Sequence, residues 1–210
     1  MYVPAHFDES RPEVLHDLIE RHPLGTLVTH SGGILDANHI PFALNSRSGP
    51  QGMLLGHVAR ANPVWKEVAS GDSVLVIFRA EHAYISPDWY PSKHEAHRQV
   101  PTWNYRVVHV HGRLQVRDDA RFVRGVVSRL THEHEDARPT PWRMADAPPD
   151  YLDGMIANIV GIEVEITRLE GKFKLGQNRE ARDIRGAAEA LTREGHGALG
   201  QLMRELPQAR

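Results

Sequence analysis

The sequence contains no cysteine among its 210 residues. This absence excludes disulfide bonds, thiolate metal sites and cysteine nucleophiles. The simplest interpretation is a cytoplasmic protein, because disulfides persist mainly in oxidising compartments.

Long hydrophobic runs are also absent. No stretch approaches the ~18–20 apolar residues that a helix needs to cross a bilayer. The opening MYVPAHFDES has neither the basic start nor the apolar middle of a signal peptide. The chain is nevertheless 40% hydrophobic and 25% charged, so we expect a folded core and no membrane segment.

Neither sign of charge dominates, since the formal net charge is −2. A dedicated nucleic-acid-binding protein usually carries a basic excess, and no clear helix-turn-helix is visible. Both features count against direct recognition of DNA.

Several motifs that carry chemistry are missing: the P-loop, GxSxG and HExxH. The tract THEHED resembles a metal-binding run, but no further ligands cluster near it in the sequence. It is better explained as the polar end of a helix followed by a loop. The sequence therefore predicts no metal site, and it offers no obvious general base or nucleophile.

Hydrophobic periodicity predicts six or seven strands with helices between and after them. A helix follows Pro12, and two strands join at Ser31-Gly32-Gly33. Asp118 or Asp119 caps a further helix. The remaining predicted elements are strands over 53–59, 73–79, 82–87, 100–116 and 161–176, a short helix over 61–70, a loop over 88–100, and helices over 151–160 and after 178. Because strands and long helices do not alternate, we expect an α+β, mainly β fold, a small antiparallel barrel decorated by helices.

Four polar or aromatic clusters lie where predicted strands end. In GHVARANPVWK, Arg60 and Asn62 precede a helix, an arrangement that suits either a phosphate site or a simple capped turn. AYISPDWY and the Trp-Asn-Tyr head of the long strand offer aromatic faces beside amides. They suit a flat heteroaromatic ligand, or they close the end of the barrel. KFKLGQNR gathers cations and amides before a helix, either as a site or as a cap.

These four segments, in this order, resemble the PaiB family, the FMN-binding negative transcriptional regulators. The resemblance runs from Met1 to about Arg179, and the last ~30 residues carry less of it. It implies the FMN-binding split barrel, similar to pyridoxamine 5'-phosphate oxidase and to flavin reductases. Such proteins are homodimers with two FMN sites at the subunit interface. We accordingly expect a split-barrel domain over 1–177 and a helical segment over 178–210.

The resemblance also implies a set of FMN-binding residues. Arg60 would hold the phosphate with His57 and Asn62, where the oxidase has a longer cage of Arg and Lys. The Trp-Asn-Tyr head would lie beside the isoalloxazine ring. The full predicted set is His57, Arg60, Asn62, Phe78, Tyr84, Ser86, Trp103, Asn104, Tyr105, Lys174, Gln177 and Asn178.

Three functions remain open on the sequence. The first is an FMN-binding regulator of the PaiB type that acts on DNA or through a protein partner. The second is a flavin-dependent oxidoreductase that acts on a small molecule, with the chemistry supplied by the cofactor. The third is a split barrel that binds another ligand, such as haem, through its histidines.

Overall fold

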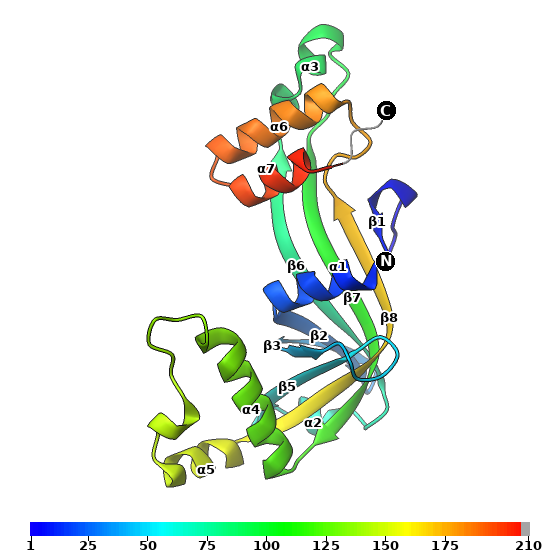
Figure 1. Ribbon diagram of the computed structural model, residues 1–210. Helices are drawn as coiled ribbons and strands as arrows, with labels where there is room; N and C mark the ends of the chain where they lie inside the picture. Colours follow the sequence, from blue (N-terminus) through cyan, green and yellow to red (C-terminus); the bar gives the residue numbers. More distant parts are fainter. Residues whose placement is uncertain (207–210) are drawn as a thin grey trace. The chain divides into compact units, whose positions relative to one another are not determined.

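The structure of the protein, a computed structural model, describes residues 1–206. The chain divides into two compact units, and each is built from segments that are distant in sequence. Unit 1 comprises Met1–Arg11, Arg79–Val108 and the described part of Glu170–Arg210, and unit 2 comprises Pro12–Phe78 and His109–Leu169. The long strands β6 (Ser73–Ile85), β7 (Thr102–Arg117) and β8 (Ile159–Lys174) contribute residues to both units (Figure 1).

The strands of residues 1–206 form one sheet with the hydrogen-bonded order β3-β2-β6-β7-β8-β5-β4, and β1 (Asp8–Glu9) pairs with β8. Every pair with a recorded register is antiparallel. The order has two ends, so the sheet is not closed into a barrel. This confirms a mainly β, antiparallel architecture with helices. No helix in the described part of the chain is both long and apolar enough to span a membrane.

Unit 2 begins with helix α1 (Pro12–Arg21), which buries Leu15, Leu18 and Ile19. A hairpin follows, and the turn between its strands contains Gly32 and Gly33 with φ of 57° and 81°. Glycine adopts this left-handed region without strain, as the predicted two-residue turn requires. The strands of this part of unit 2 are β2 (Leu24–Ser31), β3 (Ile34–Pro41), β4 (Ala43–Asn45) and β5 (Met53–Ala59).

The centre of unit 2 is an aromatic pair, Phe42 and Phe78, whose ring centroids are 6.1 Å apart. Both side chains are buried. Gly25 and Gly56 lie against them, and a Cβ at Gly56 would come within 3.0 Å of the Phe42 ring. The two glycines therefore provide the space that the rings occupy.

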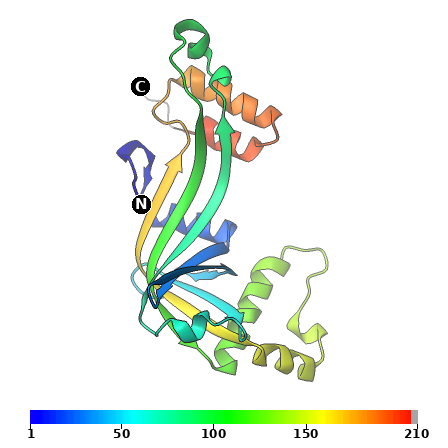
Figure 2. The same cartoon turned by 180° about the vertical axis from the view of Figure 1, so that it is seen from behind.

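Helix α4 (Ala120–Glu135) covers part of the sheet in unit 2 (Figure 2). Its N-cap is Asp119, whose carboxylate accepts a hydrogen bond from the Phe122 N–H at 2.7 Å, as the sequence predicts. The apolar face of the helix packs against Ala43. Phe122 lies directly over Gly161 of β8, where a Cβ would be only 2.5 Å from the ring.

Three further helical elements belong to unit 2: α2 (Val64–Glu67), η3 (Met144–Asp146) and α5 (Pro149–Ala157). The THEHED tract is the end of α4 and the residue after it, which confirms the predicted helix end. His132 there pairs with Asp136 at 3.1 Å. Residues 1–206 contain no group of three His, Asp or Glu side chains placed to hold a metal ion.

Unit 1 contains η1 (Ala5–Phe7), η2 (Pro87–Trp89) and the helices α3 (Pro91–Ala96), α6 (Ala181–Arg193) and α7 (Gly197–Arg204). Both views show α6 and α7 side by side (Figures 1 and 2). Asp183 of α6 is buried and accepts hydrogen bonds from the Ser92 N–H at 3.0 Å and the Ser92 hydroxyl at 2.6 Å. These bonds fix α3 to α6 within the unit.

Two predictions of secondary structure were wrong. The segments 73–79 and 82–87 belong to one continuous strand, β6. Its buried positions change from even to odd numbers between Ala80 and Ala83, so the sequence shows a break in periodicity where the strand has none. The predicted loop over 88–100 contains η2 and α3. Helix α3 has Pro91 at its start and exposes most of its length, so its sequence has no apolar periodicity. The domain division after Gln177 stays a prediction, and the helices of that segment begin at Ala181.

Gly112 of β7 provides a test of strand packing in unit 2. A Cβ there would lie 2.4 Å from Val164 Cγ1 and 2.5 Å from the Glu165 carbonyl oxygen. We expect Gly112→Ala to lower the free energy of unfolding by about 1–3 kcal/mol, the usual cost of overpacking. Urea unfolding measures this change.

Gly125→Ala is the matched control, because a Cβ at this position of α4 meets nothing within 4 Å. Alanine favours a helix interior, so this variant should be more stable than the parent by about 0.5–1 kcal/mol. Equal losses of stability in the two variants would contradict the packing account.

Candidate functional site

In unit 1 the ends of β6, β7 and β8 have one covered face and one open face. Ala83, Asn104 and Phe173 are buried on the covered face. Asn104 Nδ2 donates a hydrogen bond to the Met203 sulfur at 3.4 Å, so α7 lies on this side. Because side chains alternate along a strand, the neighbouring residues face the other way.

The open face has an aromatic surface. The Trp103 ring is stacked on His82, with centroids 6.4 Å apart, and meets Tyr84 edge-on at 6.2 Å. Tyr84 and Trp103 remain 46% and 52% exposed. An exposed ring surface of this kind suits a flat heteroaromatic ligand.

Two lysines of β8 extend this surface. Lys172 Nζ lies 5.6 Å from the centroid of Tyr105, which shares a face of β7 with Trp103. Lys174, the last residue of β8, is in phase with Lys172. Its ammonium donates a hydrogen bond to the hydroxyl of Thr102, the first residue of β7, which is in phase with Asn104. We call this set the aromatic–cationic face: His82, Tyr84, Trp103, Tyr105, Lys172 and Lys174.

The lysines of the aromatic–cationic face keep their charge available for an anion. Neither Lys172 nor Lys174 forms an ion pair with a carboxylate within residues 1–206. Partial burial lowers the pKa of Lys174, and the nearby charges of Lys172 and Arg179 lower it further. An anionic ligand would relieve both effects, since it compensates the desolvated charge.

The other predicted residues of unit 1 have local roles. Gln177 closes its own turn, because its Oε1 accepts a hydrogen bond from the Leu175 N–H at 2.8 Å and its amide nitrogen donates to the Phe173 carbonyl. Ser86 caps η2 by accepting a bond from the Asp88 N–H at 3.3 Å. Asn178 is exposed in the loop before α6. Asn104 contributes to the covered face rather than to the open one.

In unit 2 His57 has an unusual environment. It lies on β5 opposite Gly161 of β8, and its Nδ1 atom is buried without a hydrogen-bond partner in the described part of the chain. Burial lowers the pKa of the ring, because the charged form loses its hydration. A buried nitrogen of this kind usually pairs with a ligand or with ordered water.

Arg60, the predicted phosphate ligand, is engaged by protein groups. Its guanidinium donates to both oxygens of Asp118, at 3.0 and 2.6 Å, and to the carbonyls of Ala157 and Ile159 at 2.7 and 3.3 Å. The pair raises the pKa of Arg60 and lowers the pKa of Asp118. Since these contacts use four of the five guanidinium N–H groups, a phosphate would have to displace Asp118.

Asn62 and Phe78 also have structural roles within unit 2. The Asn62 amide donates to Asn38 Oδ1 at 2.7 Å, and its oxygen accepts from the Val64 N–H at 3.0 Å where α2 begins. This is the capped turn that the sequence also allowed. Phe78 is completely buried, so no part of it is accessible to a ligand in this structure.

The structure thus brings Tyr84, Trp103, Tyr105 and Lys174 together on one face of unit 1. Sequence reasoning missed His82 and Lys172 on that face. The signal that could have found them is the alternation of side chains along a strand. His82 lies two residues before Tyr84, and Lys172 two residues before Lys174, so each pair faces the same way.

Comparison with known proteins identifies the family. A family model described as "Putative FMN-binding domain" matches residues 1–168. The chain belongs to this FMN-binding family. A relative from Bacillus subtilis, the "Protease synthase and sporulation protein PAI 2", is 30% identical over 194 residues, which cover 92% of this chain and 90% of the relative. Together they confirm the PaiB-type resemblance and FMN as the cofactor.

Two further relatives come from Saccharomyces cerevisiae and Aspergillus fumigatus. An uncharacterized protein of Saccharomyces cerevisiae is 32% identical over 158 residues, which cover 66% of this chain and 93% of the relative. An uncharacterized protein of Aspergillus fumigatus is 31% identical over 240 residues, covering 93% and 92%.

Solved structures of similar fold include two flavin proteins. The FAD and haem binding protein from Mycobacterium smegmatis has a TM-score of 0.59 at 19% identity, covering 80% of this chain and 73% of that protein. The flavocytochrome Anf3 from Azotobacter vinelandii has a TM-score of 0.57 at 13% identity, covering 82% and 72%. At these identities the likeness concerns the fold alone, and it confirms the predicted split barrel.

The half-buried ring of His57 predicts a dependence of stability on pH. Its pKa in the folded protein lies below the unfolded value of about 6.5. The neutral ring therefore stabilises the fold above that unfolded pKa, and this contribution is lost as the pH falls through the folded pKa. When the pH is lowered from about 7 to about 5, the free energy of unfolding should fall less for His57→Gln than for the parent.

Urea unfolding at a series of pH values measures this difference. Exposed His94 provides the control, because His94→Gln leaves the ring of His57 in place. If the parent and His57→Gln showed parallel pH dependence, His57 would not be the titrating group.

Proposed function

We propose that this protein is an FMN-binding negative transcriptional regulator of the PaiB type, and that FMN binds on the aromatic–cationic face of unit 1. The observation that carries the proposal is the exposed surface of Trp103 and Tyr84 next to two lysines that have no carboxylate partner within residues 1–206. FMN combines a flat ring system with a phosphate, so it matches both halves of this face.

The aromatic side chains of the face bind the ring system of FMN, and the lysines bind its phosphate. Trp103 and Tyr84 stack on or flank the isoalloxazine ring, and Tyr105 lies beside them. Lys174 binds the phosphate together with Lys172, because an ammonium group acts as a point charge with three donors. FMN, when bound, supplies electron transfer that no side chain provides.

We further propose that the protein acts as a homodimer. Support comes from apolar side chains that the single chain leaves exposed: Ile34 and Leu35, at the start of β3, are 72% and 71% exposed. Strand β3 is also an end of the sheet order, and such edges are usually covered. A solution mass of 23.6 kDa by light scattering would contradict a dimer.

One observation supports the regulatory role and another concerns how it would be carried out. The net charge of −2 and the lack of a recognisable DNA-reading motif favour action through a partner protein. The printed name of the Bacillus subtilis relative concerns protease synthesis and sporulation. The alternative is a flavin-dependent oxidoreductase, since the open face leaves a bound flavin accessible to a small substrate.

FMN affinity tests the placement on unit 1. Lys174→Ala should weaken FMN binding by about tenfold to a hundredfold, because a charge-assisted contact contributes about 1.5–3 kcal/mol. Trp103→Ala should weaken it as well, through the loss of stacking. Quenching of flavin fluorescence measures both dissociation constants.

Gln177→Ala is the control for Lys174→Ala, since both side-chain hydrogen bonds of Gln177 lie within its own turn. It should melt at a lower temperature while keeping its FMN affinity. Arg60 tests the competing placement in unit 2. If Arg60→Ala weakened FMN binding while Lys174→Ala did not, the phosphate would belong at Arg60, and the proposed site would be wrong.

Turnover separates the regulator from the oxidoreductase. We expect the FMN-loaded protein to oxidise NADH no faster than free FMN at the same concentration. In the native host, deletion of the protein should raise the level of the transcripts that it represses. Reintroducing the parent chain should lower these transcripts again, whereas the Trp103→Ala variant should not. A turnover of about 1 per second or more, with no change in transcripts, would favour the enzyme. A Soret band in the absorption spectrum would favour haem.

A further inference from the structure

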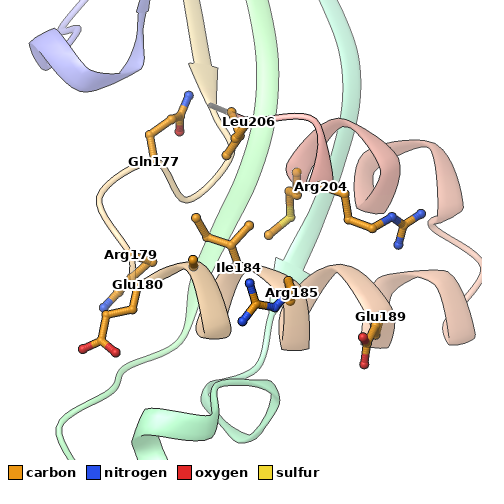
Figure 3. Close-up of a pocket in the computed structure, with 10 residues that line it drawn as sticks. Gln177, Arg179, Glu180, Ile184, Arg185, Glu189, Arg204 and Leu206 are labelled. Carbon is orange, nitrogen blue, oxygen red and sulfur yellow. The ribbon is translucent and has the colours of Figure 1, made fainter. Parts of the chain in front are cut away.

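Unit 1 contains a second feature that the FMN proposal does not use. A cavity of about 530 Å³ lies between the loop after β8 and the helices α6 and α7 (Figure 3). Its volume falls in the range of about 300–1,000 Å³ that is typical of small-molecule sites. The lining residues follow the segment 1–168 that the FMN family matches. They are Gln177, Arg179, Glu180, Ala181, Ile184, Arg185, Glu189, Met203, Arg204 and Leu206.

The arginines of the cavity are not neutralised equally. Arg179 is anchored, because it donates to Gln99 Oε1 and lies 5.3 Å from the centroid of Tyr90. Arg185 and Arg204 form no ion pair with any carboxylate in the described chain. The closest partners of Arg204 are neutral: its Nη1 lies 3.3 Å from the Thr192 hydroxyl and 3.5 Å from the Ala188 carbonyl.

The carboxylates of the cavity do not offset these charges. Glu180 is already paired with Arg182 at 2.8 Å. Glu189 is exposed, as Arg185 and Arg204 are, so solvent screens all three charges alike. The lining still has three arginines against two glutamates. The cavity therefore carries a positive excess, and two guanidinium groups there have donors available for an anion.

The remaining lining is apolar and firmly supported. Met203 is 1% exposed, and Ile184 and Leu206 are half-buried. Helices α6 and α7 pack backbone to backbone, since a Cβ at Gly200 would lie 2.6 Å from the Ala188 carbonyl oxygen. Such close packing gives the walls a fixed spacing, which a preformed site requires.

We propose that this cavity is a second ligand site, separate from FMN, for an organic anion with an apolar body. The apolar body packs on Ile184, Met203 and Leu206. Its carboxylate, sulfonate or phosphate group is held by Arg185 and Arg204, because guanidinium forks match the geometry of these anions. Figure 3 shows Ile184 and Arg185 on α6 and Arg204 on α7.

The probe for this site is 1-anilinonaphthalene-8-sulfonate, which joins an aromatic body to a sulfonate. Titration calorimetry with the FMN-saturated protein should show one probe site per chain. The double variant Arg185→Ala with Arg204→Ala should weaken binding by about tenfold or more. Calorimetry is preferred because FMN absorbs the light that the probe emits.

Two controls make the result specific. Arg193→Ala removes an exposed arginine of α6 that does not line the cavity, so probe affinity should be unchanged. N-phenyl-1-naphthylamine has the same aromatic body without the sulfonate, and it should bind the parent at least about tenfold more weakly. Thermal melts check that the double variant folds, as the exposure of both arginines leads us to expect.

Four results would overturn the proposal: no binding to the parent, displacement of the probe by FMN, equal affinity in the double variant, or equal affinity for the uncharged analogue. FMN binding is measured first, and the probe is then added to protein that is saturated with FMN. A failure of this site is therefore distinguishable from a failure of the FMN site. Conversely, loss of FMN binding in Lys174→Ala leaves the probe result interpretable.

Discussion

The alternation of side chains along β6, β7 and β8 is the constraint on which unit 1 depends. One phase places Ala83, Asn104 and Phe173 beneath the C-terminal helices. The other phase leaves Tyr84 and Trp103 on the open face. A shift by one residue would exchange the two sets, burying lysines and exposing the core. The same pleat therefore decides which residues stabilise the unit and which are available to a ligand.

A buried polar network fixes the covered side of unit 1. Asp183 receives bonds from Ser92, and the amide of Gln99 reaches both Ser92 Oγ at 2.7 Å and Asp183 at 3.3 Å. Gln99 in turn accepts a bond from Arg179. A carboxylate this deeply buried is tolerated because each of its oxygens has donors. The network joins α3, the loop after β8 and α6, and so orders the segments that border the cavity.

Much of the fold could be predicted from the sequence. Gly32-Gly33 identified the hairpin, and Asp119 marked the start of α4 by its capping chemistry. These signals are local, since each depends on residues within a few positions. Helix α3 was missed for the same reason, because it is short and largely exposed and its stability comes from Ser92 and Asp183, which are far apart in the sequence.

The candidate site was predictable only where its chemistry is independent of distant partners. Trp103 and Tyr84 are aromatic residues at strand ends, and the structure leaves both exposed. Arg60 shows the limit of local reasoning. Its ion-pair partner, Asp118, is 58 positions away, and nothing in GHVARANPVWK identifies that carboxylate. Whether a cation is free to bind a phosphate is thus a property of tertiary structure.

The contact between Phe122 and Gly161 has a consequence for how this family varies. The ring of Phe122 occupies the volume that any side chain at position 161 would need, since a Cβ there would lie 2.5 Å from the ring. The two positions therefore share one space, although they belong to a helix and to a strand that are distant in sequence. A Cβ at position 161 would also lie 2.9 Å from the Arg117 carbonyl oxygen. A relative with a larger residue on the strand should therefore carry a smaller one on the helix and a shifted backbone at position 117, so the three positions are coupled.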